Sequence, residues 1–410
     1  MIYIILIIHQ CQILLYKTKN DMKKSLVALA LGGLGIGVAE FTMMGMLPDV
    51  ALDLGISIPT AGHLISSYAL GVVVGAPLFV TAMARMSPNR TLVLLMGLFT
   101  VFNALSIISP SYGFLMVSRF VSGLPHGTFF GVGAVVASLL ADKGKEAQAV
   151  AFMFSGLTIA NLLGVPIGTY IGHAFSWRYT FLLITLVGAL TVLMLKLWVP
   201  IMEARKLERS AWKDFGIFKE PNIWFMVLII SIAPGALFAW ISYIAPLMTE
   251  VSGIAPSNMP YIMVLAGLGM VVGNLVGGKM SDGLGPSTTI ILALSFQVIC
   301  MLVIFFTASN TGISILMTFL TGAATFTIVP PLQVQLINSV QSDATMLVAS
   351  LGPACFNIAN ALGAFLGGVP IEMGYGYTSP VWVGAIMGII GVIVSLLFIL
   401  QNRKKATAQC

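Results

Sequence analysis

Only one acidic side chain of the fourteen in this chain falls inside a long apolar segment: Glu40, in the run 25–47. A charge at the centre of a bilayer costs about 2.5 to 3.5 kcal/mol, so a carboxyl group at such depth indicates a functional site. Because burial penalises the charged form, a carboxyl group there can take up and release a proton. We expect Glu40 to be a proton-coupling residue. The alternative is a glutamic acid that is permanently neutral or that bonds to its own helix.

Two further ionisable residues, Arg119 and His126, share one face of a second apolar run, 113–140. They are seven residues apart, which places them on one helical stripe. At 1.5 Å per residue, Glu40 lies about 10 Å from the end of its run and Arg119 about 10 Å from the start of the other, which places them at one level. An ion pair between them would lower the cost of burying both charges. The alternatives are an arginine bonded to backbone carbonyls and a histidine with a purely local partner.

Neutral polar and aromatic side chains within other apolar runs are candidates for contact with a substrate. Core packing is the alternative for each aromatic residue taken singly. The candidates are Phe238, Trp240, Tyr243, Gln333 and Asn357.

The elements that must position these residues are membrane-spanning helices. The chain is 58% hydrophobic and 8% charged, with a mean hydropathy of +1.00, whereas about a quarter of the residues are charged in ordinary soluble domains. A spanning helix needs about 20 apolar residues. Twelve segments meet this need, which predicts an all-α polytopic membrane protein of two six-helix bundles. The segments are 25–47, 60–83, 91–109, 113–140, 147–172, 179–200, 222–249, 259–280, 287–308, 312–338, 345–370 and 380–401.

The sequence repeats itself in parallel order. Residues 70–75 (LGVVVG) recur as 268–273 (LGMVVG), and residues 159–164 (IANLLG) recur as 358–363 (IANALG), at an offset of 198 or 199 residues. Asn161 and Asn360 are therefore equivalent positions. Two parallel repeats in so apolar a chain indicate a transporter whose halves are related by an axis along the membrane normal.

Most lysine and arginine residues fall in loops on one side of the predicted bundle, with Arg178 on the other side. Basic loops are retained in the cytoplasm, so both termini are expected there. The net charge of +6 follows from this pattern and predicts no nucleic-acid partner. The four cysteines lack metal-site or disulfide spacing, and we expect no metal, no cofactor and a monomer.

The apolar stretch before Met22 is short, contains His9, Gln10 and Gln12, and fits neither a spanning helix nor a signal peptide. We expect it to lie outside the fold, with Met22 as the natural start. An extension that lies in the membrane interface is the alternative. The expected domain organisation is an N-terminal extension (1–21), a first bundle (22–200), a linker (201–221), a second bundle (222–403) and a tail (404–410).

Several motifs together resemble the major facilitator superfamily, in particular the drug and metabolite proton-antiporter branch and its arabinose-efflux-type, AraJ-like permeases. The motifs are Ala39-Glu40-Phe41, Tyr68-Ala69-Leu70-Gly71, Arg119-x-x-x-Gly123 and Gly164-Val165-Pro166-Ile167-Gly168. The resemblance implies that the helices of Glu40 and Arg119 line one central cavity. It also implies hinge roles for Gly164, Pro166 and Gly168 and gating roles for Arg85 and Asp282. The gating loop departs from the family pattern, because the acidic residue expected before Arg85 is missing.

From the resemblance and the buried Glu40 we expect a secondary transporter that exports a small organic molecule, a sugar or a drug-like compound, in exchange for protons. It would sit in the bacterial inner membrane and work by alternating access. An uncoupled or importing facilitator for a sugar or nucleoside is the alternative, with Glu40 binding the substrate. A membrane enzyme or a sensor is disfavoured, because only Glu40, Arg119 and His126 are ionisable deep within the runs; His63, Lys196 and Lys279 lie near run ends. The sequence contains no Gly-x-x-x-x-Gly-Lys-Ser/Thr motif, so an ATP-driven pump is not indicated.

Overall fold

A computed structural model describes residues 2–83, 85–142, 146–202, 216–339 and 345–409. In these ranges the regular elements are all helices, as the sequence predicts. The first half contains α1 (Ile2–Gly45), α2 (Leu47–Leu54), α3 (Ile58–Ala82), α4 (Pro88–Ile107), α5 (Tyr112–Leu140), α6 (Glu146–Ile159), a π-helical turn (Ala160–Gly164), α7 (Val165–Ala174) and α8 (Trp177–Trp198).

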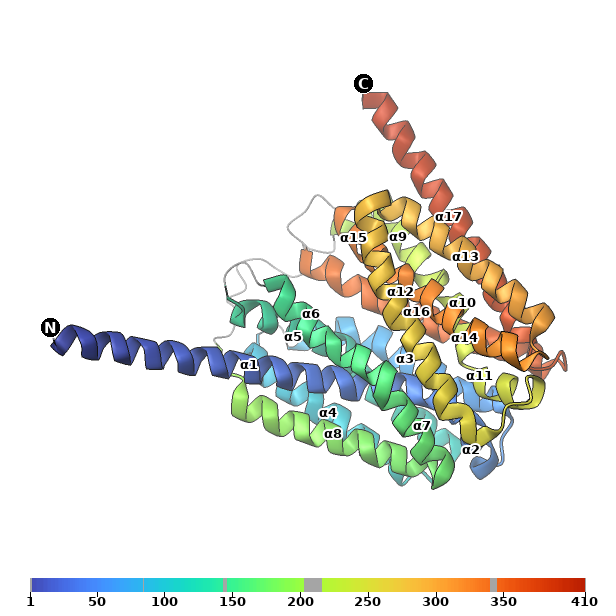
Figure 1. Cartoon of the computed structure of the whole chain (residues 1–410), viewed down its shortest axis with the longest axis horizontal. Coiled ribbons are helices and arrows are strands. Elements are labelled where there is room, and N and C mark those ends of the chain that lie inside the picture. The colour runs from blue at the N-terminus through green and yellow to red at the C-terminus, as the bar shows by residue number, and fades with distance from the viewer. Residues whose placement is uncertain (1, 84, 143–145, 203–215, 340–344, 410) are drawn as a thin grey trace.

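The second half contains α9 (Pro221–Ile232), α10 (Gly235–Ile241), α11 (Ile244–Pro246), a π-helical turn (Leu247–Val251), a 3-10 turn (Pro256–Asn258), α12 (Met259–Leu284), α13 (Pro286–Thr307), α14 (Thr311–Thr327), α15 (Val329–Asn338), α16 (Thr345–Glu372) and α17 (Ser379–Gln409). Figure 1 shows the first half below and to the left of the second. Of the expected linker, residues 203–215 lie outside the described part of the chain.

Twelve helical segments of the described chain are long and apolar enough to cross a membrane, which confirms the predicted number. Their bounds agree with the expected ones within a few residues, with one clear exception. The seventh segment ends at Ile241 rather than at residue 249. Its path is broken at Pro234 and again around Tyr243, because proline removes a backbone donor from the helical ladder.

The two ends of the bundle differ in charge. We call the end with Lys23, Arg85 and Lys279 the basic side, and the end with Asp53 and Glu372 the opposite side. Figure 1 shows α2 and α11 together at the opposite side, while the free ends of α1 and α17 project away from it.

The internal repeat is visible in the packing of the helices. A Cβ atom on Gly71 of α3 would lie 2.1 Å from the carbonyl oxygen of Phe120 of α5. At the equivalent place in the second half, a Cβ atom on Gly269 of α12 would lie 2.2 Å from the carbonyl oxygen of Phe319 of α14. Both pairs of helices approach so closely that only glycine fits, as in other membrane bundles. The duplicated sequence therefore builds the same helix contact twice.

The halves meet mainly toward the opposite side. One buried apolar cluster joins Ile36 and Phe41 of the first half to Phe238 and Ile241 of the second. A separate cluster contains only second-half residues and lies toward the basic side; among its members are Ile223, Ile290, Leu332 and Phe398. Across the boundary α16 packs against α3, and α12 packs against α7. The shared core of the two halves is thus at one end of the bundle.

Removing residues 1–21 should leave the fold and membrane insertion intact, because Lys23 and Lys24 still mark the basic end of the first span. The measurement is the amount of monodisperse protein extracted from membranes, compared with the full chain. Loss of membrane insertion in the shortened protein would contradict the expectation.

Replacing Gly123 with alanine should lower the thermal midpoint in detergent. The added Cβ would lie 2.2 Å from the carbonyl oxygen of Tyr68, so α3 and α5 must separate, and such overpacking costs about 1 to 3 kcal/mol. Gly131→Ala on the same helix is the matched control, since a Cβ there meets nothing within 4 Å. Equal midpoints for the two variants would show that close packing at Gly123 does not matter.

Candidate functional site

Glu40 lies in the interior of α1 and is only 4% exposed. Its Oε1 accepts a hydrogen bond of 3.3 Å from Nδ2 of Asn360. Asn360 belongs to α16, so the buried carboxyl group of the first half is held by an amide of the second. The sequence identifies Asn360 as a repeat position, but it gives no sign that its partner is Glu40.

The expected ion pair between Glu40 and Arg119 is wrong as a direct contact. Nη1 of Arg119 donates instead to the carbonyl oxygen of Ala39 at 2.9 Å, and Nε donates to the carbonyl oxygen of Leu64 at 3.5 Å. Its Nη2 is buried and has no hydrogen-bond partner among the described residues. The guanidinium group reaches backbone carbonyls of α1 and α3, which accept from two of its three nitrogens and need no second charge. Arg119 is thereby fixed beside Glu40 through the neighbouring residue.

Tyr68 of α3 connects Arg119 to His126, a contact that the sequence does not predict. The guanidinium carbon of Arg119 lies 4.3 Å from the centre of the Tyr68 ring, a cation–π contact. The Tyr68 hydroxyl and Nδ1 of His126 are 3.2 Å apart, and both side chains are buried. Arg119 and His126 do share a stripe of α5, and Tyr68 bridges them. The available signal was the position of Tyr68 in the motif Tyr68-Ala69-Leu70-Gly71.

Two of the five candidate substrate residues lie near Glu40 in the packing. Phe238 of α10 stacks on Phe41, with ring centres 6.3 Å apart, and meets Phe356 of α16 edge to face at 5.2 Å. Asn357 lies three residues before Asn360 on α16. Its Nδ2 donates to the carbonyl oxygen of Pro353, while its Oδ1 is buried without a hydrogen-bond partner.

The other three candidates are placed differently. The hydroxyl of Tyr243 donates to the carbonyl oxygen of Ala364 at 2.8 Å, so this group is occupied inside the second half. Trp240 is fully buried, and its indole Nε1 has no hydrogen-bond partner. Gln333 lies on α15 against Gly352, at the contact of α15 with α16. Trp240 and Tyr243 nevertheless belong to the same buried cluster as Phe238, whereas Gln333 is not a member of it.

The expected hinge residues follow a real irregularity in the helix. A π-helical turn ends at Gly164, and Pro166 is the second residue of α7. A Cβ on Gly164 would lie 2.4 Å from Cγ2 of Val38, and one on Gly168 would lie 2.7 Å from Cγ2 of Thr42. Val38 and Thr42 of α1 flank Glu40 in the sequence. Because π-turns are frequent at functional sites, the irregular helix beside Glu40 is consistent with a hinge.

The expected gating residues, Arg85 and Asp282, are both exposed on the basic side. Neither forms an ion pair with another described residue, and residue 84 lies outside the described part of the chain. In the described chain, no group of three His, Cys, Asp or Glu residues could hold a metal ion.

The loops of the opposite side fix the end of α1. Asp49 and Asp53 lie on one face of α2; Asp49 bonds to His173 at 3.0 Å. Asp53 accepts hydrogen bonds from Arg178 at 2.5 Å and from the Trp177 indole at 3.0 Å. The bond from Arg178 holds the pKa of Asp53 below its usual value, and the bond from Trp177 adds to the effect. Asp53 thus stays charged and keeps α2 docked.

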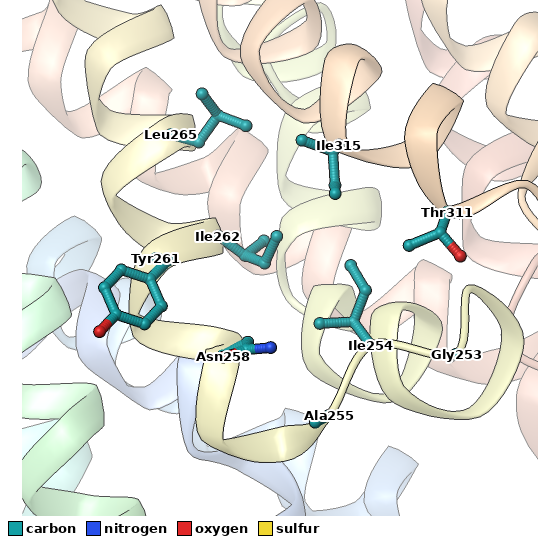
Figure 2. Close-up of a pocket in the computed structure, with 9 residues that line it drawn as sticks. All are labelled: Gly253, Ile254, Ala255, Asn258, Tyr261, Ile262, Leu265, Thr311 and Ile315. Carbon is teal, nitrogen blue, oxygen red and sulfur yellow. The ribbon is translucent and has the colours of Figure 1, made fainter.

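Figure 2 shows a hollow at the opposite side of the second half, between α12 and α14. Its lining is mostly apolar, with Asn258, Tyr261 and Thr311 as the polar members. None of its residues belongs to the group around Glu40. The chemistry of the candidate site therefore lies elsewhere, in the boundary between the halves.

Replacing Arg119 with lysine should lower the thermal midpoint, because a lysine cannot bond two carbonyls with one planar fork. Each hydrogen bond from a charged donor contributes about 1.5 to 3 kcal/mol. Arg90→Lys, at an exposed position, is the matched control and should leave the midpoint unchanged. An unchanged midpoint for Arg119→Lys would show that the bonds to Ala39 and Leu64 do not stabilise the fold.

Comparisons with known proteins agree with this architecture. The profile of the Major Facilitator Superfamily matches residues 29–352 and 245–409. The chain is 38% identical over 385 residues to the putative transporter AraJ of Escherichia coli (strain K12), covering 94% of this chain and 97% of the relative. The same values hold for the inner membrane transport protein YdhP of that organism. A crystal structure of a D-xylose-proton symporter superposes with a TM-score of 0.73 at 16% identity, over 92% of this chain and 96% of the symporter. The predicted resemblance is confirmed: the chain is a multi-pass membrane protein that belongs to the Major Facilitator Superfamily, a family of transporters and not of enzymes.

Proposed function

We propose that this transporter of small solutes exports a small organic molecule, a sugar or a drug-like compound, in exchange for protons. The observation that carries the proposal is the environment of Glu40. Its carboxyl group is buried, it lies at the boundary between the halves, and its hydrogen-bond partner is a neutral amide of the other half. Such a group can change charge without breaking an ion pair, and a proton carrier needs that freedom.

The arrangement of the halves supports alternating access. Both halves share a buried core toward the opposite side, whereas the second half has its own separate core toward the basic side. We interpret this as the state in which the site is reached from the basic side. Export then requires the shared contacts around Glu40 to part, so that the site opens at the other end.

The basic side is proposed to face the cytoplasm, with both termini there, because lysine and arginine are retained on that side. The membrane is proposed to be the bacterial inner membrane, which the name of the relative YdhP supports. We propose that one chain is the working unit, because the site is built from the two halves of one chain.

Each residue of the group receives a role that fits its contacts. Glu40 carries the proton. Arg119, fixed to the carbonyl of Ala39, supplies a positive charge next to it. His126, reached from Arg119 through Tyr68, passes protons onward. Phe238 and Asn357 contact the substrate, with an aromatic face and an unoccupied amide oxygen.

Replacing Glu40 with glutamine should abolish transport driven by a pH gradient, while binding of the substrate and exchange without a gradient persist. Glutamine keeps the shape of the protonated side chain but cannot titrate. A ligand is first identified by thermal-shift screening of sugars, nucleosides, amino acids and drugs, because a bound ligand stabilises the folded protein. Transport of that ligand is then measured in proteoliposomes with and without a pH gradient.

Glu250→Gln, which removes an exposed carboxylate of the opposite side, is the control and should transport normally. Full gradient-driven transport by Glu40→Gln would refute the proton role. Loss of ligand binding in that variant would favour an uncoupled facilitator in which Glu40 binds the substrate.

A further inference from the structure

Two hydrogen bonds join the halves in the described part of the chain, and they involve consecutive residues of α16. Asn360 donates to Glu40 of α1 at 3.3 Å, and the carbonyl oxygen of Ala361 accepts from the hydroxyl of Ser66 of α3 at 3.0 Å. One bond depends on a titratable group and the other does not. All four side chains are buried.

Apolar contacts surround these two bonds toward the opposite side. Phe41 stacks on Phe238, and the ring of His63 lies 5.7 Å from that of Phe365. A Cβ on Gly62 of α3 would lie 2.2 Å from the hydroxyl of Tyr243, so α3 also fits tightly against the second half. We call these contacts the clamp; its residues are Glu40, Phe41, Gly62, His63, Ser66, Phe238, Tyr243, Asn360, Ala361 and Phe365.

We propose that Asn360 couples the charge of Glu40 to the contact between the two halves. A charged Glu40 binds Asn360 and keeps the clamp closed. A proton on Glu40, or a donor group of the substrate bound to Glu40, weakens this bond and lets the clamp open. The inference rests on the proposed function, in which Glu40 carries the proton. It makes Asn360 a positioning residue, since it acts through Glu40.

The strength of the bond follows the charge of its acceptor. A hydrogen bond to an ionised carboxylate is roughly twice as strong as one between neutral groups. In the closed clamp Nδ2 of Asn360 donates to Glu40, while its Oδ1 is buried and finds no hydrogen-bond partner in the described part of the chain. The amide is therefore oriented as a donor, as a charged acceptor requires. A protonated Glu40 offers a weaker acceptor.

The other titratable groups near Glu40 form their hydrogen bonds, among the described residues, within the first half and not with α16. Arg119 is bound to the Ala39 and Leu64 carbonyls, and Tyr68 and His126 contact each other. His63 faces Phe365 and bonds to Tyr112, so this group of the clamp needs its own control. At the opposite-side ends of α7 and α8, His173 and Arg178 are engaged by Asp49 and Asp53.

This arrangement accounts for obligatory exchange. An empty transporter with charged Glu40 stays clamped and cannot carry a net leak. A proton on Glu40 weakens the clamp, and a substrate that donates to Glu40 displaces Asn360 from it. Either cargo permits the change of state, and the absence of both forbids it.

The repeat-equivalent asparagine provides a matched control. Asn161 lies in the π-helical turn of the first half. Its backbone carbonyl packs against Gly267 of α12, where an added Cβ would lie 2.4 Å from the carbonyl oxygen. By the offset of the repeat, the position that corresponds to Glu40 is Phe238, which carries no charge. The two halves therefore share the asparagine, but within the described residues a hydrogen bond to a titratable group is seen for Asn360 alone.

The test measures opening of the opposite side directly. Spin labels are attached at Leu52 of α2 and at Met373 after α16, which are 85% and 69% exposed. The background is the full chain with its native cysteines replaced, in lipid nanodiscs without substrate. Double electron–electron resonance then gives the distance distribution between the labels from pH 9 to pH 5. We expect a longer-distance population to grow as the pH falls, with a roughly five- to tenfold change in its ratio to the short one, from the strength of charged against neutral hydrogen bonds.

Asn360→Leu should abolish the pH dependence of this ratio, whereas Asn161→Leu and His63→Phe should keep it. Ser66→Ala removes the neutral bond, so it should raise the open population at every pH and keep the pH dependence. Asn360→Asp serves if the leucine variant does not fold. Two facing carboxyl groups share one proton in a charge-assisted bond and repel each other when both ionise, so opening should increase at high pH, the reverse of the wild type.

The inference is overturned if the wild type shows no pH-dependent opening, if Asn360→Leu keeps it, or if His63→Phe removes it. These outcomes leave the proposed function standing as long as Glu40→Gln still loses gradient-driven transport. If instead Glu40→Gln transports normally with a gradient, the proposed function itself fails, whatever the labels report.

Discussion

The structure depends on how two charges are accommodated in an apolar interior without being paired to each other. A direct ion pair between Glu40 and Arg119 would satisfy both, but breaking a buried pair is strongly destabilising, so it would also fix the charge of Glu40. The chain divides the task instead. Backbone carbonyls of α1 and α3 hold Arg119, and a neutral amide of α16 holds Glu40. Each charge has a partner, and the carboxyl group remains free to titrate.

The duplication supplies the scaffold, and departures from it supply the chemistry. Glycine-mediated contacts such as Gly71 with Phe120 and Gly269 with Phe319 occur in both halves, because each half needs the same close helix packing. The ionisable residues are not repeated in the second half. The position that corresponds to Arg119 is Thr318 at an offset of 199 residues or Met317 at 198. The position that corresponds to Glu40 is Phe238 at an offset of 198. Symmetric packing lets the halves move as similar bodies, while the asymmetric pair of Glu40 and Asn360 gives the motion a chemical trigger.

The sequence predicts the twelve spans and the repeat well, because both are written in local runs of apolar residues and in recurring glycines. It also locates Glu40, Arg119 and His126, because an ionisable residue in such a run stands out. The partners of these residues are not predictable in the same way. A backbone carbonyl such as that of Ala39 has no sequence signal, and the contact of Glu40 with Asn360 joins residues 320 positions apart in the chain. The break near Tyr243 did have a signal, since Pro234 and Pro246 flank it, and the long apolar run concealed it.

The anchoring of α1 decides which contact can change when the transporter works. At the basic side Ser25 bonds to the carbonyl oxygen of Trp198, and at the opposite side Asp53 of the adjoining α2 bonds to Arg178. Along its length, α1 meets Gly164 and Gly168 of the neighbouring helix through Val38 and Thr42. Helix α1 is thus tied at both ends and along one face to the first half, so it must move with that half. The contact of α1 with α16 of the second half has no such anchors among the described residues. The bond between Glu40 and Asn360 is therefore the place where a change of one charge can alter how the two halves fit together.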